Sequence, residues 1–142
     1  QIVDGRRRLI QFPMLVSEIT HNIKVSVECV FSSPHSQPLQ NQFVFFYHIS
    51  IENLGEFSMQ LLRRKWIIVD AHGSERQVEG EGVVGVQPSI PPQEQHEYSS
   101  SCLLSTPFGV MRGTYTFERL VDGALFEVTV PAFKLEVPYL LS

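Results

Sequence analysis

Phe43-Val44-Phe45-Phe46-Tyr47-His48-Ile49-Ser50-Ile51-Glu52 is the stretch that decides the fold class. Large apolar side chains occupy every second position from Phe43 to Ile51, and His48, Ser50 and Glu52 fall between them. Residues two apart in a β-strand point to the same face, so this stretch predicts a strand with one buried and one exposed face. The turn sequence Asn53-Leu54-Gly55 should end it.

The same alternation recurs on both sides of this strand. Residues 22–31 predict a second half-buried strand, which the proline-containing loop 32–41 should end. Residues 59–70 carry apolar side chains on both faces, which indicates a central or twisted strand. Further strands are expected at 75–79, 94–100, 111–118 and 126–130, with tight hairpin turns at 70–73 and 121–124.

Turn signals separate these segments about every 8–12 residues, as in sandwich folds. No capped segment with helical periodicity extends beyond about ten residues. Because parallel neighbours would need crossover helices, we expect an all-β, immunoglobulin/fibronectin-III-like antiparallel β-sandwich of seven to eight strands. Residues 1–20 are interpreted as an N-terminal arm or linker, 21–137 as the sandwich domain and 138–142 as a tail. The first residue is Gln, from which we expect a domain of a longer protein.

Composition narrows the function classes. The chain has 142 residues, with 11 basic and 15 acidic side chains and a formal net charge of −4, which argues against nucleic acid despite the triplets 6–8 and 63–65. No apolar run reaches the roughly 18–20 residues of a membrane helix. Two isolated cysteines fit neither a disulfide framework nor a zinc site, so we expect an intracellular protein in a reducing compartment.

One catalogue motif, G-x-G-x-x-G, is formed by Gly80, Gly82 and Gly85. In dinucleotide-binding proteins such glycines let the backbone approach a pyrophosphate at the start of a helix. Here Val86-Gln87-Pro88 follows, so no helix is expected at that point. We interpret the glycines as shaping a loop or bulge and keep anion binding as the alternative.

Catalytic and metal-binding constellations are weak in this sequence. No G-x-S-x-G elbow is present, and the five histidines show no paired spacing, so we expect neither an enzyme, a metal site nor a cofactor. Arg64 beside Trp66 could belong to a recognition surface, although core packing is the favoured interpretation of Trp66.

The loops remain as candidate binding elements, because sandwich scaffolds commonly bind through loop tips or an exposed sheet face. The favoured segments are 80–88 and 99–112, which combine small polar residues with Val83, Val84, Phe108 and Met111. The alternative is that these four side chains close the ends of the core. The binding candidates are therefore Gly80, Gly82, Val83, Val84, Gly85, Arg64, Trp66, Phe108 and Met111.

Three co-linear blocks point to a family. They are 60–70 (QLLRRKWIIVD), 78–88 (VEGEGVVGVQP) and 101–115 (SCLLSTPFGVMRGTY), followed by the ending 130–135 (VPAFKL). In this order and spacing they resemble the ApaG domain family over about residues 19–135. The resemblance implies a fibronectin-type sandwich that exists as a free bacterial protein or is appended to eukaryotic proteins such as F-box subunits, and we expect the eukaryotic or appended context.

For function, the resemblance implies a non-catalytic protein–protein interaction module that recruits a partner protein. It also implies a runner-up, a factor binding an anion, a nucleotide or divalent cobalt or magnesium, because bacterial members are linked to cobalt resistance and magnesium efflux. The partner expected here is a protein, and neither a membrane nor a nucleic acid.

Overall fold

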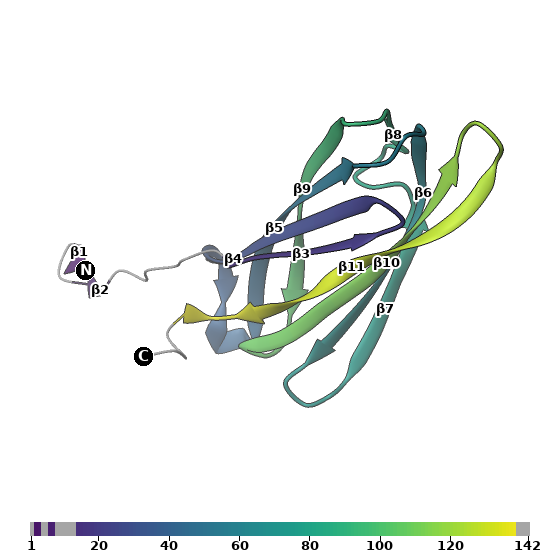
Figure 1. Ribbon diagram of the computed structural model, residues 1–142. Coiled ribbons are helices and arrows are strands. Elements are labelled where there is room, and N and C mark those ends of the chain that lie inside the picture. The colour runs from purple at the N-terminus through teal and green to yellow at the C-terminus, as the bar shows by residue number, and fades with distance from the viewer. Residues whose placement is uncertain (1, 4–5, 8–13, 139–142) are drawn as a thin grey trace.

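Two antiparallel β-sheets pack face to face in the computed structural model, which describes residues 2–3, 6–7 and 14–138 (Figure 1). The first sheet has the strand order β3-β4-β5-β9. The second has the order β11-β10-β6-β7, with β8 also paired to β6. The predicted all-β antiparallel sandwich is confirmed.

The strands have the following bounds. The first sheet contains β3 (Met14–Thr20), β4 (Ile23–Gln37), β5 (Gln42–Asn53) and β9 (Gln95–Leu104). The second contains β6 (Met59–Asp70), β7 (Glu75–Glu81), β8 (Ser89–Ile90), β10 (Phe108–Arg119) and β11 (Ala124–Glu136). A separate pair is formed by β1 (Ile2–Val3) and β2 (Arg6–Arg7), and a 3-10 turn, η1, spans Pro38–Gln40.

Alternation in the sequence becomes alternation in burial. Every second residue of β5 from Phe43 to Ile51 is buried, and the same holds for β4 from Ile23 to Val27. The central position of β6 is also confirmed, since β10 and β7 pair with its two edges. Within the described ranges, no helix is long and apolar enough to cross a membrane.

The strand β4 does not stop at residue 31 as predicted, but continues to Gln37 through Pro34. Its register against β5 is interrupted between Ser32 and Gln37, and β3 pairs only with the first part of β4. Within the described residues, Pro34 therefore lies where no neighbouring strand needs its missing N–H. The hydroxyl of Ser36 fills part of the gap, because it accepts a hydrogen bond from the Val44 N–H at 2.8 Å.

Two short strands of the sheets, β3 and β8, were not predicted. β3 lies within the predicted arm 1–20 and pairs with β4 along all seven of its residues. As an edge strand it is largely exposed, with only Val16 and Thr20 partly buried, so its sequence carries no clear alternation. The rest of that arm, apart from β1 and β2, lies outside the described residues, as do residues 139–142 of the predicted tail.

Trp66 lies at the centre of the core. Its ring centroid is 5.7 Å from that of Tyr47 on the opposite sheet, and 6.2 Å from those of Tyr115 and Phe133. All four rings are buried and meet at tilted or edge-on angles, the arrangements that aromatic rings favour. Trp66 thus joins the two sheets.

Gly113 makes room for this tryptophan. It pairs with Trp66 across β10 and β6, and a Cβ built on Gly113 would lie 2.7 Å from Cε3 of the indole and 2.5 Å from the Lys65 carbonyl oxygen. Real Cβ atoms do not approach other atoms so closely, so any side chain at 113 would displace the indole or the strand.

Gly113→Ala should therefore lower the free energy of unfolding by about 1–3 kcal/mol, the usual cost of overpacking a core. Urea unfolding followed by tryptophan fluorescence measures this change. Thr114→Val on the exposed face of the same strand is the control, expected within about 0.5 kcal/mol of the parent. Equal stability of the two variants would contradict the packing role of Gly113.

Candidate functional site

The glycine motif forms a tight hairpin after β7. Val83 and Val86 exchange backbone hydrogen bonds of 2.8 and 3.1 Å. Val84 and Gly85, between them, have positive φ angles of 46° and 79°, the signature of a type I′ turn. The chain then extends into β8, so the helix that a phosphate-binding motif requires does not follow Gly85.

Gly82 is required by the backbone itself. Its φ is +62°, and a Cβ at this position would lie 2.1 Å from the Val86 carbonyl oxygen. Its N–H donates to the Leu62 carbonyl at 2.8 Å. The amides of Gly82, Val83 and Val86 are therefore bonded within the chain rather than directed toward a ligand.

Arg64 holds the same segment from inside. Its Nη1 donates to the carbonyl oxygens of Glu81 and Gly82, both at 3.0 Å. The guanidinium lies over Gly80, where a Cβ would be 2.8 Å from Nη1. Arg64, Gly80 and Gly82 thus act together as one structural unit, which fixes the end of β7.

The remaining predicted site residues divide into buried and exposed groups. Trp66, Val83 and Met111 are buried in the core. Val84 and Phe108 are 62% and 48% exposed. These two side chains lie at opposite ends of β6. Val84 comes shortly after the β7 residue that pairs with Arg63, whereas Phe108 is next to the residue that pairs with Asp70. Seven residues of strand separate these positions by about 23 Å, so the structure does not bring the predicted loops into one surface.

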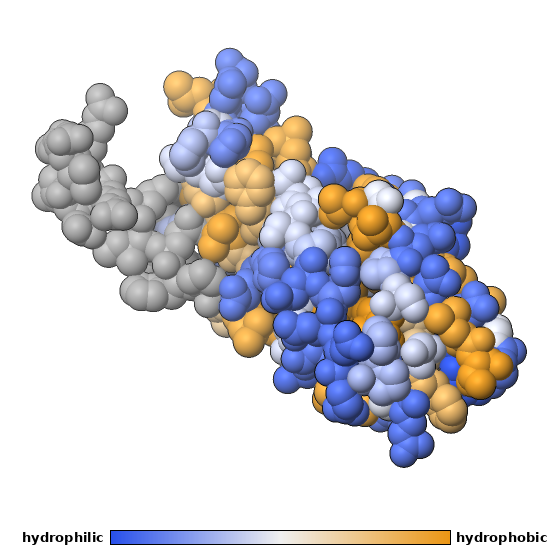
Figure 2. All heavy atoms as spheres, turned by 90° about the horizontal axis from the view of Figure 1, so that it is seen from above, coloured by the Kyte–Doolittle hydropathy of each residue, from blue (hydrophilic) through white to orange (hydrophobic). Residues whose placement is uncertain are grey.

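A different group of loops gathers at the upper end of Figure 1. We call this surface the loop end and define it as residues 21–22, 53–58 and 119–126. The Leu120 N–H donates to the Ser58 carbonyl at 3.0 Å, which ties two of its loops together. Its half-exposed or exposed large apolar side chains are Leu54, Phe57, Leu120, Val121 and Leu125. Figure 2 looks down on the sandwich from this side and shows hydrophobic patches bordered by hydrophilic side chains.

A buried asparagine shapes this surface. Asn53 is 1% exposed, and its amide nitrogen donates to the carbonyl oxygens of Phe57 and Ile90 at 2.7 and 2.9 Å. Its side-chain oxygen accepts the Gly55 N–H at 3.0 Å. Because every polar atom of this buried amide is used, the loop that carries Phe57 is held in one conformation.

Arg119 is the second organising residue of the loop end. Its guanidinium carbon lies 5.5 Å from the ring centre of Phe57 and 5.1 Å from that of Phe126, within the range of cation–π contacts. It also donates two forked hydrogen bonds to the Asp122 carboxylate, which lower the pKa of that carboxyl. His21 packs against Phe126 with 4.9 Å between ring centres. A cavity of about 400 Å³ lies among these residues.

None of these loop-end residues was predicted. The Asp-Gly signal located the hairpin 121–124, and the turn at 53–55 was recognised, but no periodicity indicates that the two meet. That proximity follows from the pairing of Arg119 with Met59, a contact between strands sixty residues apart in the sequence.

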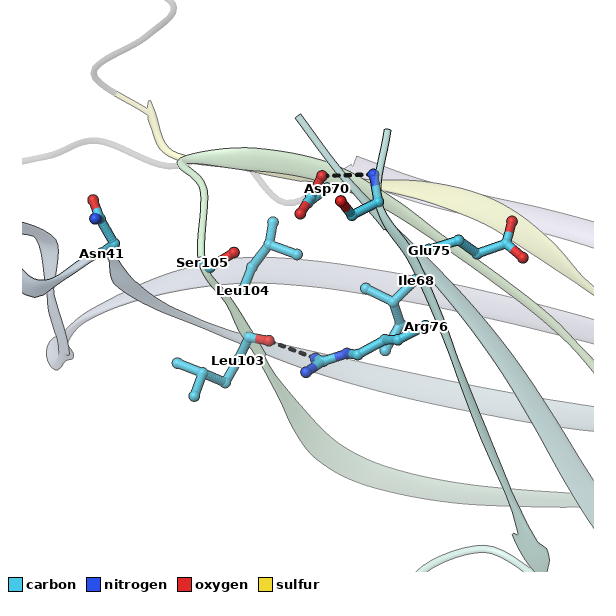
Figure 3. Close-up of a pocket in the computed structure, with 9 residues that line it drawn as sticks. Asn41, Ile68, Asp70, Glu75, Arg76, Leu103, Leu104 and Ser105 are labelled. Carbon is cyan, nitrogen blue, oxygen red and sulfur yellow. Dashed lines mark hydrogen bonds between the residues drawn. The ribbon is translucent and has the colours of Figure 1, made fainter. Parts of the chain in front are cut away.

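A second cavity, of about 220 Å³, lies at the opposite end where β7 faces β9 (Figure 3). Arg76 reaches from β7 across this opening and donates to the Leu103 carbonyl of β9, and the Cys102 sulfur lies 3.5 Å from the same nitrogen. The guanidinium of Arg76 is therefore already hydrogen-bonded within the protein. We interpret this arrangement as a bridge between the two sheets.

Metal-binding and thiol chemistry find little support in the described part of the chain. No group of three His, Cys, Asp or Glu side chains there is placed to hold a metal ion. Burial raises the pKa of the Cys29 thiol to about 12. Burial also raises the pKa of the Cys102 thiol above its usual value. Both cysteines are free, and these shifts favour the unreactive thiol form.

The cysteines should consequently react slowly with a disulfide reagent at pH 8 in the folded protein and rapidly in urea, as absorbance of the released thiolate measures. Because the pKa of Cys29 is higher in the folded state, its contribution to stability is complete below about pH 9. This contribution is lost as the pH rises from 9 toward 12, because in this range the thiol ionises more readily in the unfolded chain than in the folded protein. Cys29→Ala should reduce this alkaline loss, and an unchanged loss would contradict the assignment.

Gly82→Ala should lower the free energy of unfolding by more than about 3 kcal/mol, since it adds a backbone clash to a positive φ. Gly85→Ala is the matched control, because its φ is also positive but no atom lies within 4 Å of the added Cβ. It should cost only about 1–2 kcal/mol. Urea denaturation compares them, and equal costs would show that the close approach at Gly82 is unimportant.

Known proteins resemble this chain along most of its sequence. The family model described as the ApaG domain matches residues 33–119. The chain is 45% identical to Protein ApaG of Pseudomonas paraeruginosa over 123 residues, which are 87% of this chain and 97% of that protein. It is 46% identical to Protein ApaG of Anaeromyxobacter dehalogenans, over 84% of this chain and 94% of that protein.

A crystal structure from Bordetella pertussis, described as an ApaA protein, superposes with a TM-score of 0.79 at 42% identity, covering 82% of this chain and 94% of that one. The C-terminal domain of wzt shares the fold alone, at 9% identity and a TM-score of 0.52 over 89% of this chain and 79% of that one. The relatives named here are bacterial, so the expected eukaryotic or appended context is not borne out. The sandwich architecture and this similarity along most of the sequence together show that the chain belongs to the ApaG domain family.

Proposed function

We propose that this protein is a non-catalytic, intracellular protein-interaction module of the ApaG type, and that its loop end recruits the partner. The observation that supports this most is the concentration of exposed apolar side chains on loops that hydrogen bonds and ring contacts hold in place. Leu54, Phe57 and Leu125 present this apolar surface, and Asn53 and Arg119 fix the loops beneath it. Preorganised aromatic and aliphatic anchors are typical of interaction surfaces, because little conformational entropy is lost on binding.

The charge around the loop end indicates the chemistry of the partner. Glu52 and Glu94 line a hollow beside Leu54, and Glu56 is exposed on the same loop as Leu54. The positive charge of Arg119 is paired with Asp122. An acidic border around apolar anchors favours a protein segment that combines apolar residues with Lys or Arg.

The proposal is tested by affinity capture with the purified chain and two variants. Phe57→Ser combined with Leu125→Ser should reduce recovery of the specific partner at least tenfold, as for central interface anchors. Phe57 and Leu125 are 47% and 64% exposed, so the variant should remain folded, which circular dichroism checks. Phe108→Ser, at the opposite end of the sandwich, is the matched control and should leave recovery unchanged.

The outcomes of this experiment are distinct. If only Phe108→Ser lost capture of the partner, this result would contradict binding at the loop end. It would indicate that the partner binds at the opposite end of the sandwich. If all variants captured the partner equally well, neither of the two surfaces would be its binding site.

The alternative, binding of pyrophosphate, a nucleotide, Co²⁺ or Mg²⁺ near Gly80 to Gly85, has a separate test. Isothermal titration calorimetry with each compound should give no binding heat in the micromolar range. A binding heat that Val84→Lys or Gly85→Ala alters would favour the alternative over the interaction module.

A further inference from the structure

The outer face of the β3-β4-β5-β9 sheet carries a connected group of three side chains. The Nδ1 atom of His48 lies 2.8 Å from the Ser99 hydroxyl oxygen, and its Nε2 lies 3.2 Å from a carboxylate oxygen of Glu97. His48 and Glu97 are about half exposed. The three residues stand apart from the loop end and from the glycine hairpin.

Strand register brings these side chains together. His48 of β5 is directly paired with Ser99 of β9, and Glu97 lies two residues before Ser99 on the same face. Directly opposed and diagonal neighbours on one face of an antiparallel sheet are within reach of each other. Because the β5–β9 ladder continues on both sides of this pair, the group is held by regular structure and not by a loop.

When the imidazole of His48 is neutral, the hydrogen-bonding capacities of the three groups fix the direction of each bond. A carboxylate only accepts, so Nε2 of His48 carries the proton that it donates to Glu97. In a neutral imidazole the other nitrogen, Nδ1, is then an acceptor. The Ser99 hydroxyl therefore donates to Nδ1, which is the arrangement of a serine next to its general base.

An apolar strip lies beside this group on the same face. Phe46 precedes His48 by two residues on β5, and Leu103 lies four residues beyond Ser99 on β9; they are 37% and 49% exposed. The ring of His35 contacts Phe46 edge-on with 5.2 Å between centres. This strip offers a surface for an apolar group whose reactive end lies at Ser99.

We propose that Ser99 is a nucleophilic acyl-acceptor site for activated carboxylic esters with an apolar acyl chain. The Ser99 oxygen attacks the carbonyl carbon and forms a new C–O bond while His48 takes the hydroxyl proton. The bond to the leaving oxygen then breaks, and the proton passes from His48 to the leaving alcohol. Glu97 is a positioning residue, which orients the imidazole and stabilises its charged form.

This proposal is independent of the interaction function, and it concerns acceptance of one acyl group rather than turnover. The test incubates the full chain with p-nitrophenyl hexanoate, followed by peptide mass mapping of O-acylated serines. Acylation of Ser99 should be at least tenfold faster than that of Ser101, which lies on the same strand and face but has no imidazole partner in its register position. Ser99→Ala should remove this product.

Variants separate the roles of the residues. His48→Gln should lower Ser99 acylation to the level of Ser101. Glu97→Gln should lower it several-fold, with partial recovery in Glu97→Asp, which restores the charge. Phe46→Ala should slow acylation by the hexanoate ester but not by the acetate ester, and its unfolded fraction is checked by circular dichroism.

Two results would overturn the proposal. One is equal acylation of Ser99 and Ser101 in the native protein. The other is an unchanged Ser99 rate in His48→Gln.

Discussion

The packing of Trp66 against a glycine is the contact on which the sandwich depends. The indole occupies the space that a side chain at position 113 would fill, and Gly113 leaves this space free. From there the indole contacts the ring of Tyr47 in the other sheet. A large ring packed on bare backbone lets three strands of one sheet, β6, β10 and β11, and one strand of the other, β5, share a single aromatic core. The hydrogen bond between the hydroxyls of Tyr98 and Tyr115 connects the sheets again beside this core. Burial raises the pKa of both phenols, which keeps both protonated at neutral pH.

The glycine hairpin shows how a sequence motif acquires a structural role from its surroundings. Arg64 faces inward from a strand and uses its guanidinium to bind the carbonyl oxygens at the end of β7. A phosphate site would present amides at this place, whereas here carbonyl oxygens point to a cation supplied by the chain. Three glycines at the spacing of a phosphate-binding motif are thus found here with the opposite electrostatics.

The strand pattern could be predicted because one-sided burial leaves a period of two in the sequence. β5 and the first part of β4 show it clearly, whereas β3 does not, since neither of its faces is fully covered. The continuation of β4 through Pro34 could not be predicted, because it depends on how the described strands pair around that point rather than on residue type. The loop end was missed for a similar reason: the β10–β11 hairpin holds Arg119 beside Phe126, but Phe57 reaches them only through the pairing of β6 with β10. Burial of Met111 and Val83 also depended on register, which loop composition does not encode.

The bridge from Arg76 to Leu103 has a consequence for how the molecule behaves in a crowded solution. Among the described strands, β7 and β9 each have one side without a neighbour, and such sides can recruit further strands from other molecules. The guanidinium of Arg76 lies between these two strands and donates to the Leu103 carbonyl, which an added strand would otherwise use as a hydrogen-bond acceptor. It also places a positive charge where such a strand would pair. The arginine that closes the sandwich laterally therefore also opposes fibril growth, so colloidal solubility and internal cohesion depend on the same side chain.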